Sequence, residues 1–88
     1  MDSYVYDPRV LEELARHGLK PRPSTSPQQL RDAVRDLYKY EIRRLRSDLL
    51  ARRFRKQDYA ARVLELRRRY PLLSLPVELW TVRTTEGE

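Results

Sequence analysis

The side chains that could carry out chemistry are few, and their spacing does not suit catalysis. The chain has one histidine, His17, and no cysteine, which excludes a thiolate nucleophile and a Cys/His metal cluster. Glu12 and Glu13 are adjacent on a predicted helix, and adjacent helical side chains do not converge on one atom. Two glycines cannot form a glycine-rich phosphate loop. We therefore predict a non-enzymatic protein with no catalytic residue, metal or cofactor.

Arginine is the residue type with the clearest chemical potential. Residues 1–42 carry seven basic and seven acidic side chains, whereas residues 43–69 carry eleven basic and three acidic ones. Guanidinium groups bind carboxylates and phosphates in a bidentate manner. A GC-rich genome would also raise the arginine content without a functional reason. The sequence predicts a partner-binding basic patch made of Arg43, Arg44, Arg46, Arg52, Arg53, Arg55, Lys56, Arg62, Arg67, Arg68 and Arg69.

Two classes of partner fit such a patch. An acidic protein would complement it electrostatically, and a nucleic acid would bind it in a salt-dependent, sequence-independent way. The sequence shows neither the spacing of a helix-turn-helix nor an aromatic stacking platform. We therefore expect a small accessory protein that binds an acidic protein or self-associates as a homodimer through its helices, with a nucleic-acid-binding module as the alternative.

Two amphipathic helices must position these arginines. Between about residues 27 and 53, apolar residues recur every three or four positions at Leu30, Val34, Leu37, Tyr38, Ile42, Leu45 and Leu49. Residues 56–69 continue the pattern with Tyr59, Val63 and Leu66, and Tyr70 follows. Two such stripes joined by a short turn predict an all-α fold built on a helical hairpin. The turn contains no glycine, so we expect a simple break in helical hydrogen bonding without a left-handed residue.

Capping residues define the other helix boundaries. Asp7 and Pro8 predict a helix start, and Gly18 predicts a left-handed C-terminal cap, which gives a first helix over about 8–17. Ser26 and Gln29 form a predicted capping box at the start of the long helix, although Ser26-Pro27 also fits a proline-directed phosphorylation site. The long helix exceeds its partner by several turns, so the first helix is expected to cover the remainder.

Glu41 is the exception within the apolar stripe of the long helix. A carboxylate there is costly unless it is paired. One interpretation pairs Glu41 with an arginine or a tyrosine hydroxyl of the same chain. The other makes it a polar anchor that fixes register at an interface with a partner.

The C-terminal part is expected to be an apolar, largely non-helical tail after Pro71, with one short turn at 76–80. Leu73, Leu75 and Trp80 either cap the core or form a partner-binding segment in which Trp80 is the anchor. We predict one domain over residues 1–80 and a disordered tail over 81–88. No apolar run reaches the ~20 residues of a membrane span, and no secretory signal is evident. A cytoplasmic location is therefore expected.

Overall fold

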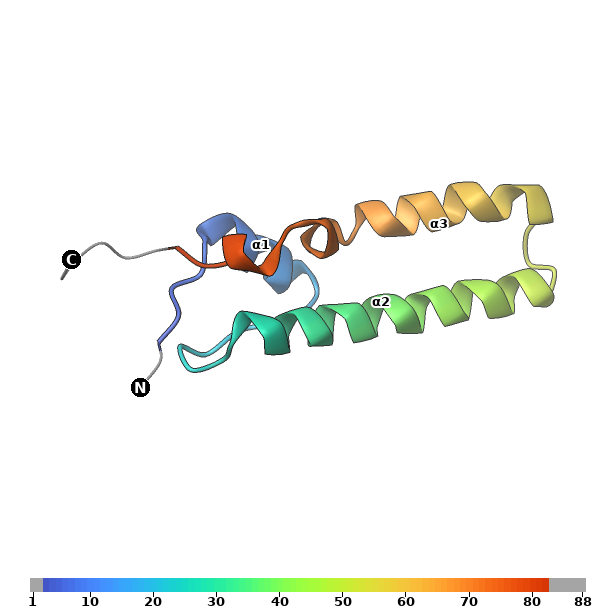
Figure 1. Ribbon diagram of the computed structural model, residues 1–88. Coiled ribbons are helices and arrows are strands. Elements are labelled where there is room, and N and C mark those ends of the chain that lie inside the picture. The colour runs from blue at the N-terminus through green and yellow to red at the C-terminus, as the bar shows by residue number, and fades with distance from the viewer. Residues whose placement is uncertain (1–2, 83–88) are drawn as a thin grey trace.

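The protein consists of three α-helices, which confirms the predicted all-α fold; the computed structural model describes residues 3–82. Helix α1 spans Pro8–Arg16, α2 spans Pro27–Leu50 and α3 spans Tyr59–Arg68. Short 3-10 helices are found at Lys56–Asp58 (η1), Pro71–Ser74 (η2) and Val77–Leu79 (η3). Helices α2 and α3 form a long antiparallel hairpin, and α1 with the C-terminal turns gathers at its open end (Figure 1). We call this end the base.

Both predicted helix starts are formed by the expected side chains. Asp7 accepts a hydrogen bond of 2.8 Å from the backbone N–H of Arg9, and this bond lowers the pKa of the Asp7 carboxyl. Ser26 and Gln29 form the complete capping box, with Gln29 N–H donating to Ser26 Oγ at 3.2 Å. The return bond from Ser26 N–H to Gln29 Oε1 measures 3.1 Å. Each cap satisfies amides that have no partner inside the helix.

Two helices end in the same left-handed motif, and only one of them contains a glycine. After α1, Gly18 has φ 75°, and the next N–H, that of Leu19, bonds back to the carbonyl of Leu14. After α2, Arg52 has φ 59°, and Arg53 N–H bonds back to Asp48. These are Schellman caps. The expectation of a turn without a left-handed residue is therefore wrong, and α2 ends at Leu50, three residues before the predicted Arg53.

The hydrophobic core lies in the base. Leu14 of α1, Val34 of α2 and Trp80 of the C-terminal segment are each 0% exposed. The other core residues are Tyr6, Val10, Leu30, Leu66, Tyr70, Leu72 and Val77. The first helix thus packs on the hairpin and covers the start of α2, because Val10 and Leu14 meet Leu30 and Val34 in one cluster.

The C-terminal segment is built into this core. Helices η2 and η3 fold it back over α2, and the indole N–H of Trp80 donates to the Leu75 carbonyl at 3.1 Å. Tyr6 and Thr81 then form an isolated antiparallel bridge, in which Asp7 N–H donates to the Trp80 carbonyl at 3.0 Å. Thr81 therefore belongs to the folded base. The rest of the predicted disordered tail beyond residue 82 lies outside the described residues.

Beyond the base the hairpin is two helices thick. We call residues 38–69 the arm; it contains most of α2, the turn, η1 and α3. Leu66, at 6% exposed, is the one buried residue among these. The seam residues between the two helices, Leu45, Leu49, Tyr59 and Val63, are half-buried. A third layer of the kind that α1 supplies at the base is absent from the described part of the arm, so its seam is open along both flanks.

Candidate functional site

Tyr70 stands where the arm joins the base and contacts all three helices. Its hydroxyl donates a hydrogen bond to Glu41 of α2. The ring of His17, just after α1, stacks on it at 4.3 Å between centroids, and Tyr38 of α2 contacts it edge-on at 5.4 Å. Burial, followed by the bond to Glu41, raises the pKa of the Tyr70 hydroxyl. The hydroxyl therefore stays protonated near neutral pH and acts as a fixed donor.

Glu41 and His17 are both engaged in this cluster. Glu41 has a tyrosine hydroxyl as its partner within the chain, which is the first of the two interpretations drawn from the sequence. Nε2 of His17 lies 2.9 Å from the carbonyl oxygen of Arg69. A carbonyl only accepts hydrogen bonds, so Nε2 carries the proton. These contacts tie α1, α2 and α3 together at the root of the arm.

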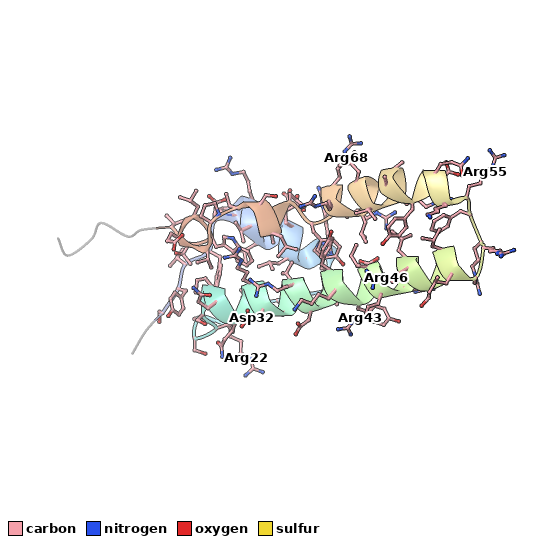
Figure 2. The ribbon with its side chains drawn as sticks, turned by 45° about the vertical axis from the view of Figure 1, so that its right-hand side comes forward. Arg22, Asp32, Arg43, Arg46, Arg55 and Arg68 are labelled. Carbon is pink, nitrogen blue, oxygen red and sulfur yellow. The ribbon has the colours of Figure 1, made fainter. Side chains whose placement is uncertain are left out.

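All eleven residues of the predicted basic patch are exposed, but they do not share one face. Arg43 extends from the edge of α2 that faces away from α3, and Arg68 extends from the opposite edge of the hairpin (Figure 2). Arg55 lies at the tip, where it lines a hollow together with Arg52 and Lys56. The single patch predicted from the sequence is therefore divided among several surfaces of the arm.

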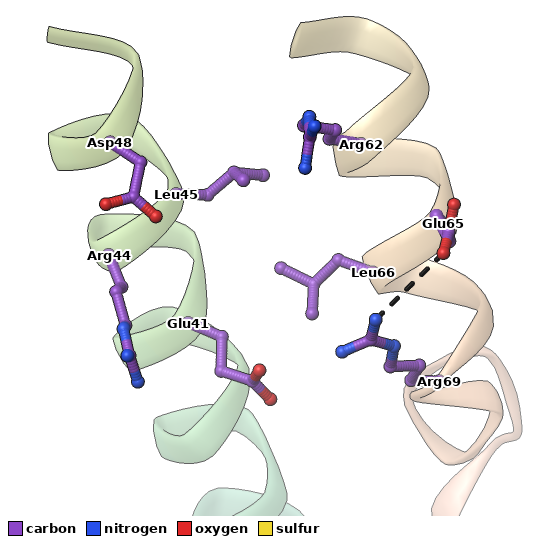
Figure 3. Close-up of a pocket in the computed structure, with 8 residues that line it drawn as sticks. All are labelled: Glu41, Arg44, Leu45, Asp48, Arg62, Glu65, Leu66 and Arg69. Atoms are coloured by element: carbon purple, nitrogen blue, oxygen red, sulfur yellow. Dashed lines mark ion pairs between the residues drawn. The ribbon is translucent and has the colours of Figure 1, made fainter. Parts of the chain in front are cut away.

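One flank of the arm is a groove with balanced charges. It is about 320 Å³ in volume, and Leu45 and Leu66 form its apolar part. Its charged lining is three arginines and three carboxylates, which alternate along the two helices (Figure 3): Arg44, Arg62, Arg69, Glu41, Asp48 and Glu65. Arg69 and Glu65 form an ion pair of 4.0 Å across one helical turn. The groove, which we call the mixed groove, has no net charge.

The opposite flank has a different composition. On α2, residues at spacings of three and four pass through Lys39, Ile42, Arg46 and Leu49. On η1 and α3 the corresponding stripe passes through Lys56, Ala60, Val63 and Arg67. Both stripes lie across the seam from the mixed groove, because the helical repeat places them on the other side of Leu45 and Leu66. We call these eight residues the basic flank; they include four cations and no carboxylate.

Two hollows adjoin the basic flank: one shares Leu49 and Lys56 with it, and the other shares Arg67. The hollow at the tip, about 750 Å³, is lined by Leu49, Leu50, Arg52, Phe54, Arg55, Lys56 and Gln57. The hollow at the end of α3, about 460 Å³, is lined by Leu64, Arg67, Arg68, Pro71 and Ser74. Neither lining contains an acidic side chain. Leu50 is 77% exposed and Leu64 is 52% exposed, so each hollow presents an accessible leucine beside arginines.

The arm therefore concentrates positive charge away from the mixed groove. Residues 38–69 contain twelve basic and four acidic side chains, and the groove accounts for three of each sign. Nine exposed cations and one carboxylate, Asp58, remain on the other surfaces. Of these cations, Arg53 forms an ion pair of 3.6 Å with Asp48. Within residues 3–82 no ion pair involves the four cations of the basic flank.

The base presents a groove whose charged rim is mainly acidic, in contrast to the basic flank. It is about 760 Å³ and runs between α1 and the C-terminal turns, with Leu72, Leu75 and Leu79 among its apolar residues. Asp7, Glu12, Glu13 and Arg9 provide its charged rim. Trp80 is fully buried, and Leu73 and Leu75 are half-buried against the core, so this segment packs as a cap in the way the first interpretation expected. Trp80 is not accessible as an anchor for a partner.

Neither a bilayer span nor a metal-ion cluster is found in residues 3–82. None of the helices there combines the length and the apolar character needed to cross a membrane. No three His, Asp or Glu side chains of this part approach one another closely enough to hold a metal ion. The notable surfaces of the described chain are thus the arm and the groove of the base.

Comparison with known proteins gives no family assignment: no protein-family model, curated protein or solved structure matches the chain. Functional inference therefore rests on the geometry of the molecule itself. Five of the eight basic-flank residues were not identified from the sequence as site residues: Lys39, Ile42, Leu49, Ala60 and Val63. The signal for them is their helical spacing, which becomes informative once the helix pairing shows which flank carries the carboxylates.

Proposed function

We propose that the protein is a non-catalytic binding module whose arm docks on an acidic partner protein. The observation that supports this most strongly is the imbalance on the arm outside the mixed groove, with nine exposed cations and one carboxylate. Such a surface attracts an acidic partner and speeds its association. The half-buried seam offers apolar surface that a partner would bury further.

Side-by-side pairing of two arms is disfavoured by the same charges. Residues 43–69 carry a net charge of +8, so a symmetric pair would place two such surfaces within a few ångströms of each other. Charges at that distance lie inside the screening length of about 8 Å at physiological ionic strength and repel each other. This argument favours a partner of different composition over a second copy of the chain.

A nucleic acid is the second candidate, and the same positive surplus favours it. Two observations favour an acidic protein over a nucleic acid. The basic flank intersperses its cations with Ile42, Leu49 and Val63, and aliphatic side chains suit a protein interface better than a phosphate backbone. The aromatic rings at the end of the arm, Phe54 and Tyr59, face each other at 6.5 Å, and Arg62 lies 4.4 Å from the centre of the Phe54 ring. These rings are engaged with each other and with an arginine of the chain.

Binding measurements with a variant of the tip test the proposal. The full-length chain would capture partners from a lysate of the organism that encodes it, next to Arg52→Glu/Arg55→Glu, and each captured protein would be titrated in purified form. We expect a direct, salt-dependent interaction with an acidic protein that this variant weakens at least about tenfold. Tighter binding to DNA and RNA than to any captured protein, with a steep salt dependence, would support the nucleic-acid alternative instead.

A further inference from the structure

We propose that the basic flank is the docking face of the arm and that its occupant is an acidic amphipathic helix of the partner. This inference rests on the proposed function and specifies both the surface and the chemistry of its ligand. It depends on the difference between the two flanks of the seam. The lining of the mixed groove balances three arginines with three carboxylates, whereas the basic flank offers cations without any carboxylate.

The apolar residues of the flank are placed to receive a helix. Ile42, Leu49 and Val63 are half-buried along the seam. A third helix laid over them would convert the two-helix arm into a three-helix layer and remove this surface from water. Helices dock in this way through apolar residues at spacings of three and four.

The position of α1 identifies the flank that remains open. Helix α1 ends at Arg16, and Arg16 and His17 line a pocket together with Glu41 and Arg69, which also line the mixed groove. The third layer of the base therefore lies on the side of the mixed groove. The basic flank lies on the other side of the hairpin, away from α1.

The length of α3 sets the spacing of the anchors on the partner. The basic flank runs along α3, which has ten residues and is therefore about 15 Å long. A partner helix whose apolar side chains contact the flank at both ends of α3 needs the outermost two about ten or eleven positions apart. Glutamates at the edges of its apolar stripe would face Arg46 and Arg67 on the two sides of the seam.

A synthetic peptide can test this geometry on the full-length protein. The probe is a capped, glutamate-rich helical peptide with leucines at spacings of three and four, the outermost about eleven positions apart. A second peptide of the same composition, with its leucines scattered around the helix, controls for charge. We expect the first to bind at least about tenfold more tightly than the second, with an affinity that falls as salt rises.

Two matched substitutions identify the flank. Arg46 and Arg44 are both exposed and lie two positions apart on α2, so Arg46→Glu and Arg44→Glu change the net charge equally. We expect Arg46→Glu to weaken peptide binding about tenfold and Arg44→Glu to weaken it less than about threefold.

The outcomes separate this inference from the proposed function. Equal loss in both arginine variants, or a larger loss in Arg44→Glu, would overturn the assignment to the basic flank while leaving the arm as the binding element. Failure of the first, amphipathic peptide to bind would overturn the proposed occupant. A concentration-dependent dimer that Arg46→Glu disrupts would show that a second copy occupies the flank. The tip variant Arg52→Glu/Arg55→Glu tests the proposed function of the arm, which predicts weaker binding by this variant.

Discussion

Replacing Tyr70 with phenylalanine should loosen the attachment of the arm to the base. The substitution removes the hydroxyl that donates to Glu41 and leaves the ring against His17 and Tyr38. Hydrogen bonds to charged groups contribute about 1.5–3 kcal/mol, and Glu41 is half-buried, so part of its hydration is retained. We expect a loss of about 1–2 kcal/mol in the free energy of unfolding. For a domain of this size each kcal/mol corresponds to about 4–8 °C in melting temperature.

A double-mutant cycle separates this bond from other effects of the substitution. Thermal and urea unfolding followed by circular dichroism would compare wild type, Tyr70→Phe, Glu41→Ala and the double variant. If the two side chains stabilise each other, the double variant should lose about 1 kcal/mol less than the sum of the single losses. Strict additivity would refute the account of this junction, because it would show that the hydroxyl and the carboxylate do not interact.

The pH dependence of unfolding gives an independent check. The ordinary pKa of a tyrosine is 10.0, and burial with the Glu41 bond raises that of Tyr70 in the folded state. A raised pKa favours the neutral hydroxyl, so its contribution to stability is fully present below pH 10 and is lost as the pH rises above it. As the pH is raised above 10, wild type should therefore lose more of its free energy of unfolding than Tyr70→Phe does. Equal losses would contradict the assignment.

Three further substitutions test the backbone and the core. Arg52→Gly should be more stable than Arg52→Ala by up to about 1 kcal/mol, and should melt at a higher temperature, because glycine adopts φ 59° without strain. Equal melting temperatures would argue against the left-handed cap. Gly18→Ala should cost about 1 kcal/mol although an added Cβ meets nothing within 4 Å, since φ 75° is unfavourable for alanine. Trp80→Ala should cost about 3–5 kcal/mol in urea unfolding, because it empties a fully buried site; a loss below about 1 kcal/mol would place Trp80 outside the core.

The helix starts and the hairpin were predictable because their causes are local. Asp7, Ser26 and Gln29 act on amides within three residues, and the apolar stripe of α2 repeats at the period of the helix. The end of α2 was not predictable in this way. An arginine in the left-handed region has no signature in the sequence, and the cap at Arg52 is visible only through the bonds that Arg52 and Arg53 make to Leu49 and Asp48.

The arrangement of charge around the arm also lay beyond the sequence. The counts in residues 43–69 showed a surplus of arginine, but a count does not say which side chains share a surface. That depends on how α3 is rotated against α2, and Leu45 and Leu66 fix this rotation beside the mixed groove. Similarly, the packing of Trp80 depends on a bridge between Tyr6 and Thr81, whose positions are far apart in the chain.

Hydrogen–deuterium exchange with and without the acidic helical peptide tests the central claim most directly. The claim is that an open, two-helix arm with one basic flank is the binding element of this protein. We predict slower exchange across residues 42–50 and 59–68 on binding, with α1 and the C-terminal turns unchanged. Slower exchange in α1, η2 and η3, with an unchanged arm, would place the site in the groove of the base and contradict the claim.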